Sequence, residues 1–191
     1  MPQVPLTQLW LPILLSAACV FVASSLIHMV LKWHASDYNA LANEDEVRAA
    51  IRKANPAPGQ YVLPHCADMK DMAKPDMLAK YTEGPVAMLM VNPNGPPAMG
   101  VALGKWFAYT VLVAFMAAYL AGRTLGPGTH YLQVFRVVGA VSFLAYGFGS
   151  IQMAIWMGKP WRSAPKDLAD ALIYGLLSAG IFGALWPKAL G

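Results

Sequence analysis

Charged residues are scarce in this chain. Only 13% of its 191 residues are Asp, Glu, Lys or Arg, whereas 57% are hydrophobic. A typical soluble domain carries roughly 25% charged residues, and so few charges would not cover the surface of a soluble protein of this size. The hydrophobic residues are also gathered in blocks, which is typical of membrane spans. Composition therefore excludes an ordinary soluble protein and favours an integral membrane protein.

Cysteines and the common catalytic motifs are also scarce or missing. The two cysteines, Cys19 in an apolar run and Cys66 in a polar stretch, predict free thiols rather than a disulfide framework. The sequence lacks a phosphate-binding glycine loop with its lysine, a Gly-x-Ser-x-Gly elbow, a His-Glu-x-x-His pair and a dinucleotide fingerprint. It also lacks a Cys-x-x-Cys pair and histidines placed for bis-histidine haem. These absences favour a non-catalytic protein, and no cofactor is predicted.

Four long apolar blocks are present, at about residues 9–31, 99–122, 131–158 and 168–186. At roughly 1.5 Å of rise per residue, each is long enough to cross a hydrocarbon layer of about 30 Å. The first block lacks a preceding basic region, so we expect a retained anchor rather than a cleaved signal. The predicted fold is an all-α membrane protein: a four-helix transmembrane bundle with a small, mostly helical extramembrane segment. Residues 1–32 form the first span, 33–98 the loop segment and 99–191 the other three spans.

The basic residues predict the orientation. Of the 14 Lys and Arg residues, 11 lie in or beside the segments 33–98 and 159–167, and only Arg123, Arg136 and Lys188 lie on the side of the termini. The positive-inside rule then places both loops in the cytoplasm and both termini in the periplasm. The long loop slightly exceeds the roughly 60 residues over which the rule applies, but the short loop independently gives the same result. This distribution explains the net charge of +4 without nucleic acid as a partner.

The loop segment 33–98 has its own structural signals. Asn43 followed by three acidic residues, with Arg52 and Lys53 further on, predicts a helix over 44–54. Short helices are expected over 68–73 and 75–81, and an extended piece over 60–63. The apolar stretch 86–91 either pairs with 60–63 or lies on the membrane surface.

Polar residues in the loop-side half of the spans are the first candidate site: His28, Lys32, Lys105, Gln152, Asp167 and Asp170. Ionisable groups are costly in a membrane, so their presence invites a functional interpretation as a proton or solute site. Two structural interpretations stand beside it. Lys32 and Lys105 can extend to the headgroups while the acids cap the fourth helix, or Lys105 can pair with Asp170 and stabilise packing.

A second candidate is a metal site at His65, Cys66 and Met69, whose imidazole, thiolate and thioether suit copper, with zinc as another possibility. His28 and His34 are further donors at the end of the first span. The competing interpretation is that these methionines pack as apolar residues. Small-xxx-small patterns at Gly100/Gly104, Ala145/Gly149 and Ala179/Gly183 predict close helix packing, within the chain or in an oligomer.

Several stretches carry a resemblance to a known group of proteins. These are Leu26–Tyr38, Asn43–Arg48, Pro58–Pro64, Gly84–Val86 and Trp156–Trp161. They resemble a group of small bacterial inner-membrane proteins that have four spans and a long first loop and no assigned activity. The resemblance extends over most of the chain. It implies a bacterial inner membrane and assigns no site residue.

Three functional hypotheses follow. The first is a non-catalytic accessory or partner-binding membrane protein, with the bilayer and other membrane subunits as partners. The alternative is a channel or transporter for a small solute or ion, which requires a homo-oligomer because four spans with few polar residues rarely enclose a pore. The second alternative is a metal-handling membrane protein that uses the His65 cluster.

Overall fold

The computed structural model describes residues 3–189 and contains four helical segments that are long and apolar enough to cross a membrane. They are Trp10–Leu31, Met99–Thr124, Tyr131–Trp156 and Trp161–Ala184. The chain is therefore an integral, multi-pass, all-α membrane protein, as predicted. It divides into two compact units, one formed by the residues up to Tyr38 together with those from Ala98 onward, and the other by Asn39–Pro97.

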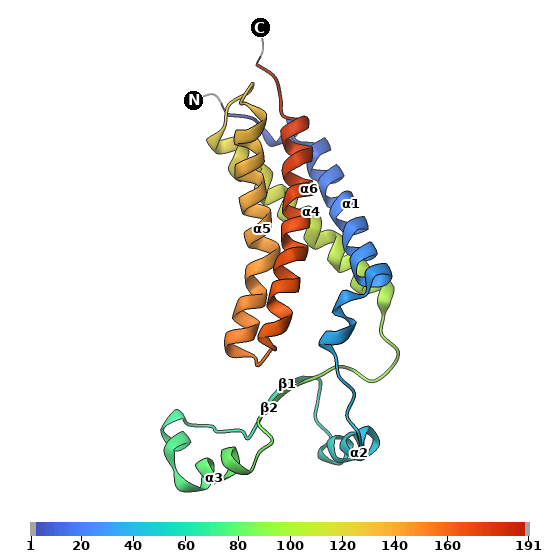
Figure 1. Ribbon diagram of the computed structural model, residues 1–191, viewed down its shortest axis with the longest axis vertical. Helices are drawn as coiled ribbons and strands as arrows, with labels where there is room; N and C mark the ends of the chain where they lie inside the picture. Colours follow the sequence, from blue (N-terminus) through green and yellow to red (C-terminus); the bar gives the residue numbers. More distant parts are fainter. Residues whose placement is uncertain (1–2, 190–191) are drawn as a thin grey trace. The chain divides into compact units, whose positions relative to one another are not determined.

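The first unit is the helix bundle (Figure 1). Its α-helices are α1 (Trp10–Ser25), α4 (Met99–Thr124), α5 (Tyr131–Trp156) and α6 (Ala164–Ala184). Short turns flank them: the 3₁₀ helices η1 (Leu6–Gln8), η3 (Trp33–Asp37) and η5 (Trp161–Ser163), and the π-helix η2 (Leu26–Leu31). The fourth helix starts at Ala164 rather than near 168, because Pro165 occupies a first-turn position where its missing N–H costs no hydrogen bond.

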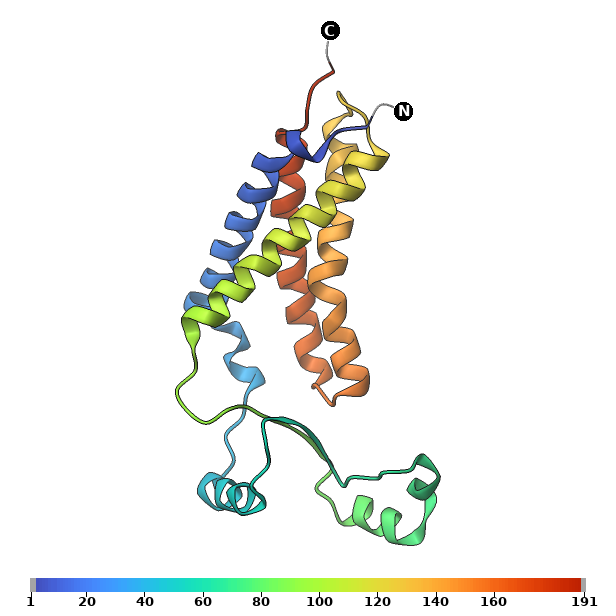
Figure 2. The same ribbon diagram turned by 180° about the vertical axis from the view of Figure 1, so that it is seen from behind.

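Helices α5 and α6 lie side by side (Figures 1 and 2), and small residues form their contact. A Cβ placed on Gly147 would lie 2.9 Å from the Cβ of Ala171, and one on Gly175 would lie 3.2 Å from the carbonyl oxygen of Gly139. Without side chains at these positions the two backbones approach each other, which is how many membrane helices associate. Gly139, Gly147 and Gly175 in this contact lie outside the predicted patterns, whereas Ala179, which faces Gly139, belongs to one of them.

Only one of the three predicted small-residue patterns, Ala179/Gly183, takes part in close packing within the described chain. Ala179 is buried in the α5–α6 contact, and Gly183 packs against the ring of Tyr131. In contrast, a Cβ on Gly100, Gly104 or Gly149 would have no neighbour within 4 Å. For these three glycines the prediction of packing within the chain is wrong, because they lie on helix faces that no other described helix covers.

The bundle is closed at the end where the termini lie. Buried apolar residues from all four helices form a core there: Val4, Leu9, Ile13, Ala114, Ala117, Ala118, Ala121, Val134, Val138, Phe182 and Trp186. The N-terminal segment is fixed to α4 by a hydrogen bond from the Val4 amide to the Gly122 carbonyl, at 3.0 Å. At the opposite end, α1 and α4 diverge from α5 and α6 (Figure 2).

The second unit contains α2 (Glu44–Ala54), η4 (Met69–Ala73), α3 (Pro75–Glu83) and a two-stranded antiparallel sheet. Strand β1 (Gly59–Leu63) pairs with β2 (Ala87–Val91), with Tyr61 opposite Leu89. The predicted helix over 44–54 is confirmed. The pairing of 60–63 with the apolar stretch near 86–91 is also confirmed.

Candidate polar site at the open end of the bundle

The site begins with an irregular end to the first span. After Ser25 the α-helix widens into the π-helix η2, in which the Lys32 amide donates to the Ile27 carbonyl at 3.0 Å. Single π turns inside longer helices are frequent at functional sites. Lys32 then adopts a left-handed conformation with φ of 52°, which is uncommon for a residue with a side chain. The chain therefore changes direction at Lys32, and the η3 turn comes to lie against α6.

His34 in η3 lies between two carboxylates. Its Nδ1 is 3.0 Å from Oδ2 of Asp37, and its Nε2 is 2.9 Å from Oδ2 of Asp170 on α6. The side chains are largely buried, with 13% of His34 and 7% of Asp170 exposed. A neutral imidazole carries a proton on only one nitrogen. In the absence of another cation, two such contacts therefore require an imidazolium ring or a protonated carboxyl group.

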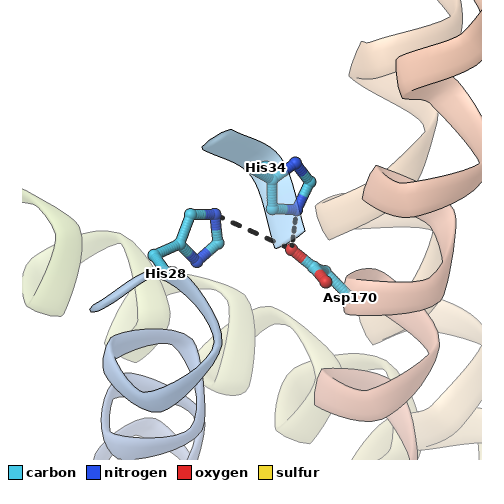
Figure 3. A group of neighbouring side chains, drawn as sticks. All are labelled: His28, His34 and Asp170. Atoms are coloured by element: carbon cyan, nitrogen blue, oxygen red, sulfur yellow. Dashed lines mark hydrogen bonds and ion pairs between the residues drawn. The ribbon is translucent and has the colours of Figure 1, made fainter. Parts of the chain in front are cut away.

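His28 in η2 approaches the same carboxylate oxygen as His34 (Figure 3). Its Nδ1 lies 3.0 Å from the Ser24 carbonyl oxygen, and its Nε2 lies 3.7 Å from Oδ2 of Asp170. A carbonyl only accepts hydrogen bonds, so Nδ1 carries the proton and Nε2 faces the carboxylate. The His28 and His34 rings are stacked, with centroids 4.9 Å apart and planes 5° apart.

Lys166 at the start of α6 fixes Asp37 and the η3 turn. Its ammonium group donates to Oδ1 of Asp37 and Oγ of Ser36, each at 2.8 Å, and to the Trp33 carbonyl at 2.9 Å. The Lys166 ammonium lowers the pKa of Asp37 to about 2; desolvation opposes this shift, and the hydrogen bond with His34 adds to it. Asp37 is therefore a stable carboxylate that orients His34.

Asp167, the second carboxylate oxygen of Asp170 and Tyr174 complete the site. Asp167 accepts hydrogen bonds from Lys159 and from the Ser150 hydroxyl. Oδ1 of Asp170 and the hydroxyl of Tyr174 are buried and have no hydrogen-bond partner among the described residues. An unpaired buried carboxylate oxygen is unfavourable, so Asp170 Oδ1 is an unusual feature of this site.

A cavity of about 490 Å³ opens beside these residues, within the divergent end of the bundle. Its polar lining residues include Ser24, His28, Asp167 and Asp170, and its apolar lining residues include Met29, Met99 and Leu103. Trp106 also lines it, and its indole N–H donates to the Ser24 hydroxyl at 2.8 Å. The walls are predominantly apolar with a few convergent polar groups, which is the usual composition of a small-molecule site.

The structure brings together only part of the predicted polar set. His28, Asp167 and Asp170 line the cavity, whereas Lys32, Lys105 and Gln152 are exposed and their side chains have no hydrogen-bond partner within residues 3–189. The predicted Lys105–Asp170 pair does not form, because Asp170 is paired with histidines. Leu103 and Trp106, three residues apart, share the cavity face of α4, and Lys105 points about 100° away from Trp106 on the helix.

The residues predicted as a metal site, His65, Cys66 and Met69, belong to the second unit and do not line this cavity. His65 and Met69 are exposed, and the Cys66 thiol donates to the Asp68 carbonyl at 3.0 Å. Cys19 and Cys66 are free thiols, as predicted. In the described part of the chain, the three-residue group of His, Cys, Asp or Glu able to hold a metal is His28, His34 and Asp170. Asp37 and Lys166 were not predicted as site residues, and His34 was predicted only as a further donor for the His65 cluster, because the approach of all three depends on the turn at Lys32.

No protein-family model, curated protein or solved structure matches this chain. The chemistry of the site is therefore the basis for the functional argument. It combines a partly buried polar cluster with an adjoining apolar cavity, both within one membrane unit.

Proposed function

We propose that this protein is a ligand-binding protein of the bacterial inner membrane that takes a small amphipathic molecule into the cavity at its open end. The cavity is the observation that supports this function. Its volume, about 490 Å³, falls in the range of roughly 300–1,000 Å³ found for small-molecule sites. This proposal develops the small-solute hypothesis, but it needs no continuous pore through the chain.

The lining indicates the kind of ligand. Met29, Met99 and Leu103 suit a hydrocarbon portion, because burying apolar surface there is favourable. Asp167 and Asp170 bring two carboxylates to the lining, so we expect the ligand's polar group to be a hydrogen-bond donor such as an amine, amide or hydroxyl. Met29 and Met99 are 66% and 63% exposed on segments bordering or within the membrane spans, which supports entry from the lipid phase.

The orientation belongs to the same proposal. The excess of basic residues in the two loops supports cytoplasmic loops and periplasmic termini, which puts the cavity at the cytoplasmic end of the bundle. Alkaline phosphatase fused to either terminus is then expected to be active, and the same enzyme inserted in the 159–167 loop inactive. Opposite activities at the two termini would contradict four crossings.

The ligand proposal is tested by filling the cavity. Leu103→Trp places a large side chain in the cavity, whereas Leu112→Trp, at an exposed position of the same helix, is the matched control. The probe is a long-chain amine carrying a dansyl group, and its binding to the purified protein is measured by dansyl fluorescence. We expect binding at least tenfold weaker for Leu103→Trp and unchanged for Leu112→Trp.

Equal probe binding by the two variants, or no saturable binding by the unaltered protein, would overturn the ligand proposal. The hypothesis of an accessory subunit would then be the better account. That hypothesis stays a prediction, and recovery of a stoichiometric membrane partner in mild detergent would support it.

A further inference from the structure

We propose that His28, His34 and Asp170 bind a divalent first-row transition metal ion such as Zn²⁺ or Fe²⁺. The three side chains come from η2, η3 and α6, and one ligand atom of each lies within 4.8 Å of the others (Figure 3). This site differs in residues and ligand chemistry from the soft-metal site predicted at His65, Cys66 and Met69. It shares His28 and Asp170 with the cavity lining, but it rests on the distances and hydrogen bonds of the three side chains rather than on the cavity volume.

The distances around Asp170 are close to those of a metal site. Two ligands bound to one ion at about 2.0–2.1 Å lie roughly 2.9–3.4 Å apart in octahedral or tetrahedral geometry. His34 Nε2 already lies 2.9 Å from Asp170 Oδ2, and His28 Nε2 lies 3.7 Å from the same oxygen. The His28 ring must tilt out of its stack with His34, because a metal lies in the plane of each imidazole that binds it. With 52% of its side chain exposed, His28 has room to do so.

Both histidines have the outer hydrogen bonds of metal ligands. A ligating imidazole usually donates its second N–H to a carboxylate or a backbone carbonyl, which fixes the ring and its tautomer. His34 Nδ1 is bonded to Asp37, which Lys166 holds in turn, and His28 Nδ1 is bonded to the Ser24 carbonyl. Both Nε2 atoms are therefore directed at Asp170 with their lone pairs available to a cation.

Asp170 supplies a second, independent observation. It is 5% exposed, and its Oδ1 is buried without a hydrogen-bond partner among the described residues. A buried carboxylate with an unpaired oxygen is costly unless a cation offsets its charge. A divalent ion bound to Asp170 provides that charge.

A proton shared between His34 and the two aspartates is the competing account. It explains the contacts of His34, but it gives no role to His28, whose Nε2 is also directed at Asp170. Two nitrogen ligands and one carboxylate oxygen favour zinc or ferrous iron over Cu(I), which prefers sulfur. Three protein ligands also leave coordination positions open to water or to a molecule in the cavity.

The test uses the full chain with a tag that contains no histidine, purified in detergent and titrated with Co²⁺ as a spectroscopic probe and with Zn²⁺ in competition. We expect one Co²⁺ per chain, visible as d–d absorption and displaced by Zn²⁺. Affinity is expected to fall at least 100-fold in His34→Gln and in Asp170→Asn. His65→Ala, at an exposed histidine of the other unit, is the matched control and is expected to bind as the unaltered protein does.

Two further variants keep the test decisive if Asp170→Asn does not fold. His28→Ala, at a half-exposed position, is expected to lose the d–d absorption while remaining monodisperse. Asp37→Asn, which leaves all three ligands in place, is expected to bind Co²⁺ about 10–100-fold more weakly. Absence of stoichiometric Co²⁺ binding by the unaltered protein, or equal binding by His28→Ala, would overturn the proposal. Binding of the dansyl probe tests the cavity ligand in a separate experiment from the Co²⁺ titration.

Discussion

His34 and its neighbours show how a few polar side chains are accommodated at the edge of a membrane bundle. The ring contacts Asp170 through one nitrogen and Asp37 through the other, and Lys166 neutralises Asp37 from the far side. Charges removed from water are tolerated when they are paired and hydrogen-bonded, and this chain of contacts meets that condition everywhere except at Asp170 Oδ1. The unpaired Asp170 Oδ1 is the reason to propose that the cluster binds a cation and does not only stabilise helix packing.

The depressed pKa of Asp37 gives a pH-dependent stability. A carboxyl group whose pKa is about 2 in the folded protein and 3.8 when unfolded stabilises the fold above pH 4, and this contribution is lost as pH falls from 4 to 2. Asp37→Asn should therefore lower the melting temperature by an amount that is constant above about pH 5 and shrinks toward pH 2. Thermal unfolding in detergent across this range measures the difference.

Asp45→Asn is the control for that comparison, because Asp45 is 98% exposed and its pair with Arg48 lies on the surface, where ion pairs contribute little. A melting-temperature difference for Asp37→Asn that does not change between pH 5 and pH 2 would show that Asp37 acts through its shape rather than its charge.

The packing of α5 against α6 depends on which glycines of α5 face α6. Gly147 and Gly149 lie two residues apart on α5, yet only Gly147 meets α6, where Ala171 occupies the adjoining surface. Residues two apart on a helix point about 200° from each other, so they face opposite sides. The tight α5–α6 pair thus depends on Gly147, while Gly149 faces away from the bundle.

Leu substitution at Gly147 and at Gly149 distinguishes the steric cost of a side chain between the helices from the gain in helix propensity over glycine. Gly147→Leu should destabilise the protein by about 1–3 kcal/mol, because its Cβ would lie 2.9 Å from that of Ala171. Gly149→Leu should leave stability unchanged or slightly raised, since Gly is a poor helix former and no atom lies within 4 Å. Thermal or denaturant unfolding of both variants tests this, and equal destabilisation would argue against the α5–α6 contact.

Much of the fold could be predicted from the sequence, and the site only in part. The spans follow from blocks of apolar residues, and α2 follows from Asn43, an acidic first turn and a basic last turn. Asp170 and His28 stood out as ionisable groups in apolar surroundings. Their partner His34 was expected only as a further donor for the His65 site, because its true position depends on the π turn and on the left-handed Lys32, for which the sequence offers no glycine signal. The exposure of Lys105 likewise depends on the rotation of α4.

The fold of the whole bundle brings residues that are far apart in the sequence together at its open end. His34 and Asp170 are separated by 136 positions in the chain, so their contact requires that the first and fourth spans lie together at the open end. The two spans that lie between them in sequence, α4 and α5, contribute walls of the cavity through Leu103, Trp106 and Tyr146. Both proposals, the amphipathic ligand and the metal ion, depend on this arrangement.

Cross-linking tests that arrangement most directly. In a background carrying Cys19→Ser and Cys66→Ser, the pair His34→Cys with Asp170→Cys is treated in native membranes with a short bifunctional thiol reagent, and the pair Lys105→Cys with Asp170→Cys is the control. The account predicts rapid intramolecular cross-linking of positions 34 and 170 and little at 105 and 170. Efficient cross-linking of 105 with 170 and none of 34 with 170 would contradict it.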